Sequence, residues 1–201
     1  MKIVYKVVTA VLAACILPLI IFLPIIDYCF NTPLLEFVEP GKKYIADSIS
    51  VAGLLENVSL LSKFETGGNT PAGLKAFINP ALTAVVFLIL IAVFAILTCV
   101  LAIVMKKGTG ACISVIYGMM CTYMFTVSFN SLVKPLTDGS VSIASLFDSW
   151  QLALVGSVEY IKISGAYYYI YIMFAAILVW TLAYYLTIPK EDTKSSYRAK
   201  Q

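Results

Sequence analysis

The sequence predicts an all-α integral membrane protein: a four-transmembrane-helix bundle with short amphipathic helices in two extracytoplasmic loops and with both termini in the cytoplasm. Composition is the first observation behind this prediction. The chain of 201 residues is 61% hydrophobic and 12% charged, whereas charged residues make up about a quarter of a soluble domain. A chain this apolar is expected in a membrane rather than in water.

The second observation is that charged residues avoid four long windows. Asp, Glu, Lys and Arg are absent from residues 7–26, 76–105, 108–133 and 163–189. About 20 apolar residues cross a hydrocarbon core of about 30 Å as a helix, which satisfies its own backbone hydrogen bonds. We expect spans at about 5–26, 81–105, 111–131 and 165–188, with outer loops at about 27–80 and 132–164. Residues 1–189 then form a single membrane domain, and residues 190–201 form a polar cytoplasmic tail.

The third observation is the charge of the connecting segments, because short loops rich in Lys and Arg stay in the cytoplasm. Segments 27–75 and 134–162 are net acidic. The other charged residues lie near the two termini and between the second and third spans. Two of them are acidic, Glu191 and Asp192, and the others are basic: Lys2, Lys6, Lys106, Lys107, Lys190, Lys194, Arg198 and Lys200. Both termini are therefore expected on the cytoplasmic side of a plasma membrane, with a bacterial cytoplasmic membrane preferred.

The first span contains Pro18 and Pro24. Proline removes a backbone donor and crowds the preceding turn, so a bend is expected near Pro18. We interpret it as a static kink, with a hinge or gate as the alternative. Residues 12–15 also fit a lipobox ending at Cys15, but the apolar run continues beyond this cysteine, so the first span is expected to remain in the chain.

The third span carries a ridge of small residues at every fourth position. Its members are Gly110, Ser114, Gly118, Thr122 and Thr126. Such a ridge lets a neighbouring helix approach closely and offers hydroxyls for hydrogen bonds between helices. We expect the ridge at a helix interface, with the second span as the nearest neighbour and a partner protein as the alternative.

Aromatic residues mark both ends of the fourth span. Tyrosines gather at the outer boundary and a Trp with two tyrosines at the inner one: Tyr167, Tyr168, Tyr169, Tyr171, Trp180, Tyr184 and Tyr185. Amphipathic rings at the headgroup level are typical of a membrane-spanning helix. An interfacial aromatic belt is the simplest interpretation, and a sugar or quinone site is the alternative.

The two outer loops are predicted to carry helices. In the second loop an apolar stripe at helical spacing comprises Ile143, Phe147, Trp150, Leu154, Val158 and Ile161, which predicts an amphipathic helix. In the first loop, turn signals bracket a segment over about residues 42–64 whose apolar residues surround most of a helical circumference. Together the loops are expected to form a helical cap on the outer face.

Several function classes lack the residues they need. The chain has no histidine, which excludes Ser-His and Cys-His catalysis and the common zinc helix. The spans contain no carboxylate or amine, the groups that ion-coupled carriers use at membrane depth. Glu36 and Glu39 are the one carboxylate pair weighed as a cation site, and solvated side chains are the preferred interpretation. No catalytic, cofactor-binding or metal-ligating residue is assigned, and no cofactor is expected.

The layout of two inner termini, a long first outer loop and a shorter second one resembles that of the claudin and tetraspan groups. The claudin signature of first-loop tryptophans followed by a cysteine pair is missing, because the first loop contains only Cys29 and no Trp. The cysteine motif of tetraspanins is also missing from the second loop. The resemblance is therefore one of layout, and no residue roles follow from it.

We expect this chain to act as a non-catalytic membrane subunit, scaffold or adaptor, because packing surface is ample and reactive constellations are lacking. Its expected partners are the lipid bilayer and other membrane proteins or further copies of itself, and not nucleic acid. One alternative is a channel or permease component that conducts a solute through a neutral pathway. A third is a membrane enzyme acting on lipid or envelope precursors through outer carboxylates such as Glu36, Glu39 or Asp47.

Overall fold

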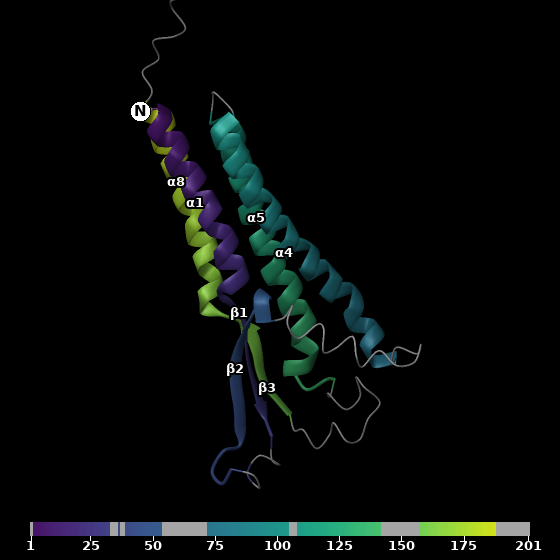
Figure 1. Ribbon diagram of the computed structural model, residues 1–201. Helices are drawn as coiled ribbons and strands as arrows, with labels where there is room; N and C mark the ends of the chain where they lie inside the picture. The colour runs from purple at the N-terminus through teal and green to yellow at the C-terminus, as the bar shows by residue number, and fades with distance from the viewer. Residues whose placement is uncertain are drawn as a thin grey trace, which may run out of the picture.

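The computed structural model describes residues 2–32, 36, 39–53, 72–104, 108–141 and 157–187. Its elements, in chain order, are α1 (Lys2–Phe22), β1 (Pro24–Asn31), β2 (Tyr44–Ser50), α4 (Ala72–Val104), α5 (Thr109–Thr137), β3 (Ser157–Ile163), a 3-10 turn η2 (Gly165–Tyr167) and α8 (Tyr168–Thr187). Figure 1 shows a bundle of helices with a small β-sheet at one end. The chain is thus mostly helical, as the sequence predicts.

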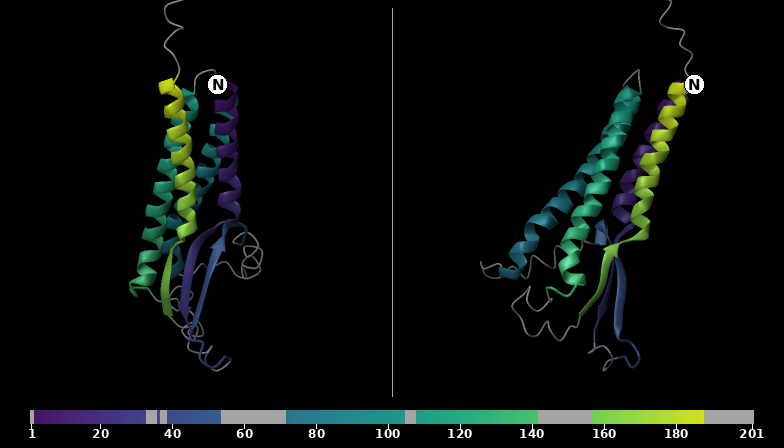
Figure 2. Two further views of the ribbon diagram at one scale, coloured as in Figure 1. Left: turned by 90° about the vertical axis from the view of Figure 1, so that its left-hand side faces the viewer. Right: turned by 180° about the vertical axis from the view of Figure 1, so that it is seen from behind.

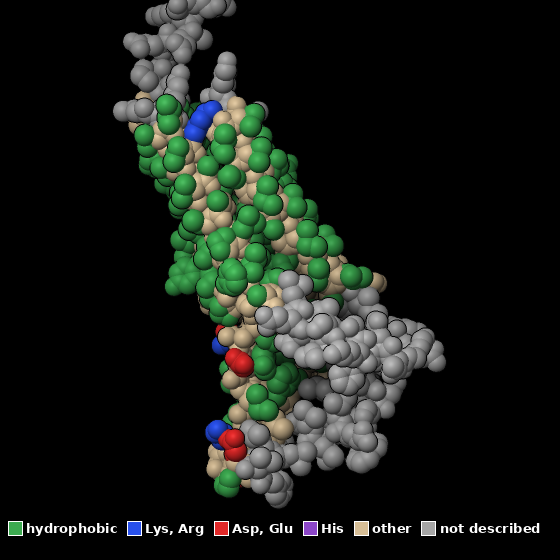
Figure 3. Space-filling view, in the orientation of Figure 1, with side chains coloured by type: hydrophobic (Ala, Val, Ile, Leu, Met, Phe, Trp, Pro, Cys, Tyr) green, Lys and Arg blue, Asp and Glu red, His purple; other side chains and the backbone are tan. Residues whose placement is uncertain are grey.

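Within the described ranges, four helices are long and apolar enough to cross a membrane: Ile3–Phe22, Asn79–Val104, Thr109–Thr137 and Gly165–Thr187. The prediction of a multi-pass membrane protein with four spans is therefore confirmed. Figure 3 shows the matching surface, on which hydrophobic side chains cover the helices and charged side chains appear on the sheet and at the opposite end of the bundle.

The four helices form a closed ring in which α1 contacts α4, α4 contacts α5, α5 contacts α8, and α8 contacts α1. The first residues of α1 lie beside the last residues of α8, where the rings of Tyr5 and Tyr184 stack with centroids 3.9 Å apart. We call this the termini end of the bundle. The sheet lies at the other end, the sheet end, as both views in Figure 2 show.

The helices differ in length in a way that makes room for the sheet. With 33 and 29 residues, α4 and α5 are about 50 Å and about 44 Å long at 1.5 Å per residue. With 21 and 20 residues, α1 and α8 reach only about 30 Å. At the sheet end α4 and α5 therefore project beyond α1 and α8, and β1 and β3 occupy the space beside this projection (Figure 2).

The first helix ends four residues earlier than predicted. It stops at Phe22, and Pro24 opens strand β1, so residues 24–26 of the predicted first span are not helical. Proline at position 24 disfavours helical geometry at Leu23 and cannot donate to a preceding carbonyl. The following Ile25 and Ile26 are β-branched residues that favour an extended strand.

The sheet corrects the described part of the prediction of helices in the outer loops. It has the order β2-β1-β3, and both pairings are antiparallel. Residues 44–50 of the predicted first-loop helix form β2, and residues 51–53 are helical. Val158 and Ile161 of the predicted second-loop helix lie on β3. The other four members of that stripe, Ile143, Phe147, Trp150 and Leu154, lie outside the described residues, as does the rest of the first-loop segment.

One face of the sheet is largely apolar, with Asp47 as its charged member, and part of this face meets the bundle. Cross-strand pairing places on this face Ile26, Tyr28, Phe30, Ile45, Ile49, Val158, Ile161 and Ile163. Ile26, Ile161 and Ile163 pack against the buried core of the helices, and β3 contacts α5. A backbone hydrogen bond from Ser164 N to Ile25 O, 2.8 Å long, joins the exit of β3 to the start of β1. The sheet is thus attached to the bundle by core packing and by two direct chain connections.

Candidate membrane-embedded interaction site

The small residues of α5 point mainly into the bundle. Ser114, Gly118 and Thr122 are buried, whereas Gly110 and Thr126 are half-buried. At Ser114 the ridge faces α4, because the hydroxyl oxygens of Thr98 and Ser114 lie 3.0 Å apart. Both hydroxyls also lie within hydrogen-bonding distance of the Phe94 carbonyl, at 2.7 and 3.1 Å.

About one turn further along α5, at Gly118, the same ridge faces α8. The absent side chain of Gly118 makes room for the ring of Phe174, and a Cβ at this position would lie 2.6 Å from two ring carbons. The hydroxyl of Tyr167 donates to the Thr122 carbonyl at 3.1 Å. Tyr167 is 0% exposed, so it is a core residue rather than a member of the outer aromatic belt. The ridge therefore serves contacts within the bundle at these three positions.

The bundle contains a polar layer near its termini end. Thr9, Thr98, Ser114 and Thr181 come from four different helices, and each lies about one and a half to two turns from the termini end of its helix. All are at most 2% exposed. The Thr9 hydroxyl has no hydrogen-bond partner among the described residues, whereas the Thr181 hydroxyl donates to the Ile177 carbonyl at 2.8 Å.

The hydroxyl contact between α4 and α5 yields a prediction on stability. We expect Thr98→Val or Ser114→Ala to lower the unfolding free energy by about 1 kcal/mol, the scale of interhelical hydrogen bonds measured in membranes. The double variant should cost less than the sum of the single changes, because the two hydroxyls contact each other. Thermal unfolding of the four proteins in one detergent measures this coupling, and strict additivity would contradict it.

An aromatic cluster closes the termini end between α1 and α8. The Tyr5 ring stacks on Tyr184, and the Tyr5 hydroxyl oxygen lies 3.4 Å from the hydroxyl oxygen of Thr181. A Cβ on Gly108 would lie 2.4 Å from the Tyr5 hydroxyl, so the turn between α4 and α5 also contacts this ring. Tyr5 is 4% exposed. Its contacts join three parts of the chain: α1, α8 and the turn between α4 and α5. Beside it, Lys6 Nζ donates to the Ile103 carbonyl near the end of α4 at 2.7 Å.

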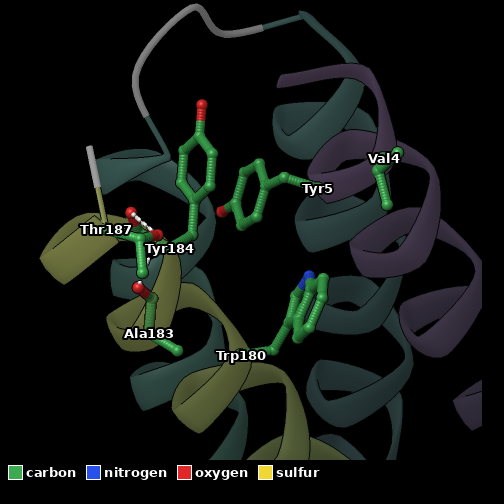
Figure 4. A pocket seen from close by; sticks show the side chains of 6 residues that line it. All are labelled: Val4, Tyr5, Trp180, Ala183, Tyr184 and Thr187. Carbon is green, nitrogen blue, oxygen red and sulfur yellow. Dashed lines mark hydrogen bonds between the residues drawn. The ribbon is translucent and has the colours of Figure 1, made fainter. Parts of the chain in front are cut away.

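A cavity of about 330 Å³ lies beside this cluster. Its lining comes from the first turn of α1 and the last turns of α8: Val4, Tyr5, Trp180, Ala183, Tyr184 and Thr187. Figure 4 shows the Tyr5 and Tyr184 rings face to face and the indole of Trp180 nearby. The Thr187 hydroxyl is already bonded to the Ala183 and Tyr184 carbonyls, at 3.0 Å each. The cavity is therefore predominantly apolar, and shape rather than charge governs what fits it.

A shallow groove continues from this cavity along the outer side of α8. Its volume is about 510 Å³, and its lining is Ile172, Ala175, Ala176, Val179, Trp180 and Ala183. Trp180 and Ala183 line both hollows, so the two are adjacent. Ala176, Val179 and Ala183 are exposed. We call this surface the α8 groove.

The sequence contains one signal for the α8 groove, the spacing of two alanines in the fourth span. Ala176 and Ala183 are seven residues apart, which places them on one face of a helix two turns apart. Chemically, the groove offers alanine methyls, aliphatic side chains and one indole, which suits an apolar helix or chain.

The acidic pair near β2 is engaged with lysines. Glu36 lies 3.5 Å from Lys43 Nζ, and Glu39 forms an ion pair with Lys42. Among the described residues no group of three or more Cys, Asp or Glu side chains could hold a metal ion. The five cysteines are all free thiols in this structure.

Comparison with protein-family models, with curated proteins and with solved structures finds no match for this chain. Its class, a multi-pass membrane protein with four apolar helices, therefore follows from the sequence and the structure themselves.

Proposed function

We propose that this protein is a non-catalytic integral membrane subunit, scaffold or adaptor, which packs against a partner membrane protein through the α8 groove. The observation that carries the proposal is the groove on the outer side of α8, which is lined by the exposed Ala176 and Ala183 and by Trp180 and lies next to the apolar cavity. The partner is a membrane helix, since the groove lies on a helix that itself spans the apolar layer.

The physical basis is the packing of helices in lipid. Lipid tails are as apolar as side chains, so helices associate through close packing rather than through burial from water. Ala176 and Ala183 permit a neighbouring backbone to approach α8, whereas Val179 and Trp180 supply contact area on either side. The inward-facing ridge on α5 is used within the bundle, which leaves the α8 groove as the better surface for a partner.

We further propose that both termini lie in the cytoplasm and that the sheet lies outside, in a plasma membrane of bacterial type. The charge distribution of the sequence supports this orientation, because the basic residues collect with the termini and the outer loops are acidic. The structure supports it in one respect: both termini-proximal helix ends lie at the same end of the bundle.

The test is a substitution that fills the groove. We expect Ala176→Phe together with Ala183→Phe to abolish copurification of the partner from native membranes in mild detergent, because two rings would occupy the floor of the α8 groove. Ala14→Phe is the matched control, since Ala14 is an exposed alanine on α1 that does not line the groove. Copurified mass is measured by size-exclusion chromatography with light scattering.

Two results would contradict the proposal. One is a wild-type protein that leaves its native membrane as a solitary monomer, and the other is a groove-filled variant that retains its partner. Solute flux through liposomes containing only this protein would instead support the alternative of a channel with a neutral pathway.

A further inference from the structure

We infer that the outer edge of β2 is a docking site for an extended polypeptide segment of another protein, which adds a fourth strand to the sheet. This surface is separate from the α8 groove, and the inference does not depend on the proposed function. It rests on three features: the free backbone groups of β2, its exposure on both faces, and the orientation of the sheet relative to the helices.

The backbone groups of β2 divide into two alternating sets. Thr32 N donates to Lys43 O at 2.8 Å, and the register pairs Ile45, Asp47 and Ile49 with Phe30, Tyr28 and Ile26. In an antiparallel ladder, residues two apart point their N–H and C=O groups to the same neighbour. Lys43, Ile45, Asp47 and Ile49 therefore bond to β1, and the groups of Tyr44, Ala46 and Ser48 point to the opposite edge.

This opposite edge is unpaired within the described part of the chain. The sheet ends at β2 in the order β2-β1-β3, and the one hydrogen bond found there is from Ser48 N to its neighbour's carboxylate oxygen, Asp47 Oδ1, at 2.7 Å. Tyr44 and Ala46 each offer a donor and an acceptor, and Ser48 offers its carbonyl. Donors and acceptors that alternate at the spacing of a strand can form hydrogen bonds with the backbone of another extended segment.

The exposure of β2 supports the same interpretation. A strand covered on one face shows alternating burial, but five consecutive residues of β2, Tyr44 to Ser48, are all exposed. Tyr44 and Ile45 are 54% and 42% exposed, and they project to opposite faces of the strand. An incoming strand thus gains contact area on both faces in addition to the backbone hydrogen bonds.

A second copy of this chain in the same membrane does not fit the β2 edge. Two β2 strands paired edge to edge in antiparallel fashion are related by a two-fold axis perpendicular to the sheet. The strands run away from the bundle roughly along the helices (Figures 1 and 2), so this axis would turn the second copy upside down in the bilayer. The other edge strand of the sheet, β3, lies against α5 and is not free to pair with β2 of a neighbouring copy.

The faces of β2 define the chemistry of the incoming segment. Ile45 and Ile49 lie on the apolar face with Asp47 between them, and Tyr44, Ala46 and Ser48 lie on the other face. The complementary strand alternates, with an apolar, a basic and an apolar residue on one face and small hydroxyl residues on the other. A basic residue opposite Asp47 also draws its carboxylate away from Ser48 N, which releases that donor for the ladder.

The probe for the test is the synthetic heptapeptide TITKTIT, labelled with a fluorophore and added to the full-length protein in nanodiscs. We expect it to raise the fluorescence anisotropy saturably. Ala46→Pro should weaken binding at least tenfold, because proline removes the outward N–H at the centre of the edge while the ladder to β1 stays intact. Ala46→Val is the matched control, which keeps this N–H and should bind like the wild type.

Two further measurements make the result decisive. The amide of Asp47, which faces β1, should keep its protection from hydrogen exchange in Ala46→Pro, so that lost binding is not lost folding. The same heptapeptide with a methyl group on the backbone nitrogen of every second threonine should not bind. No saturable binding to the wild type, or equal binding to Ala46→Pro and Ala46→Val, would overturn the inference.

Discussion

Replacing Gly118 by leucine is expected to lower the unfolding free energy by about 3 kcal/mol. A Cβ alone would lie 2.6 Å from two ring carbons of Phe174, and this ring is 0% exposed, so it has no free space to enter. Overpacking a filled core costs about 1–3 kcal/mol because side chains and backbone must shift, and leucine adds four carbons where α5 packs against Phe174 of α8. The effect is measured by thermal unfolding in detergent, with the loss of monodisperse protein as the signal.

Two controls separate this clash from a general effect of losing glycine. Gly165→Ala should be nearly neutral, because a Cβ at Gly165 meets nothing within 4 Å. Combining Gly118→Leu with Phe174→Ala should restore part of the stability, since the leucine then occupies the space that the ring leaves. A double variant no more stable than Gly118→Leu would show that the close contact with Phe174 is not the cause.

Replacing Tyr5 by alanine is expected to have the second-largest effect, again about 3 kcal/mol, because truncating a buried aromatic side chain costs about 3–5 kcal/mol in soluble cores. The Tyr5 ring stacks on Tyr184 and contacts the turn at Gly108, so its loss removes contacts of α1 with α8 and with the α4–α5 turn at once. The measurement is the thermal midpoint of the purified protein.

Tyr5→Phe distinguishes the ring from its hydroxyl. The hydroxyl lies 3.4 Å from Thr181 Oγ1, a long contact near the limit of hydrogen bonding, so its removal should cost less than about 1 kcal/mol. If Tyr5→Phe were as unstable as Tyr5→Ala, the polar contact rather than ring packing would hold the termini end together.

The four helices were predictable because one physical requirement dominates them. A span needs about 20 apolar residues without charges. This requirement is visible in the composition of the sequence whatever tertiary contacts the helix makes. The end of α1 was less predictable, because the apolar run continues past Phe22 into Ile25 and Ile26. Only Pro24 marked the change from helix to strand.

The strand β3 was misread as part of a helix for an identifiable reason. Val158 and Ile161 are three residues apart, which is a helical spacing. In the structure they lie on one face of a strand because the register shifts between Cys29 and Phe30 of β1, so that Val158 pairs with Phe30 and Tyr160 with Cys29. A β-bulge inserts one residue, here Glu159, and thereby changes the strand period from two to three.

The α8 groove depends on information that one chain's sequence does not contain. Alanines at 176 and 183 are compatible with facing lipid, a neighbouring helix of the bundle or a partner. The choice is decided by the rotation of α8 in the ring, which buries Ile170, Phe174, Ile177 and Thr181 and so turns the alanines outward. That rotation depends on contacts with α1 and α5, which are far from α8 in the sequence.

The direct connections between α1 and β1 and between β3 and α8 have a mechanical consequence. One residue, Leu23, separates helix from strand at the first connection, and Ser164, bonded to Ile25, precedes the short turn into α8 at the second. Both connections are short, so the sheet is joined almost directly to the ends of these two helices. We therefore expect a displacement of β1 or β3 to shift α1 and α8 along their length, as far as the termini end of the bundle, where Tyr5 and Tyr184 meet.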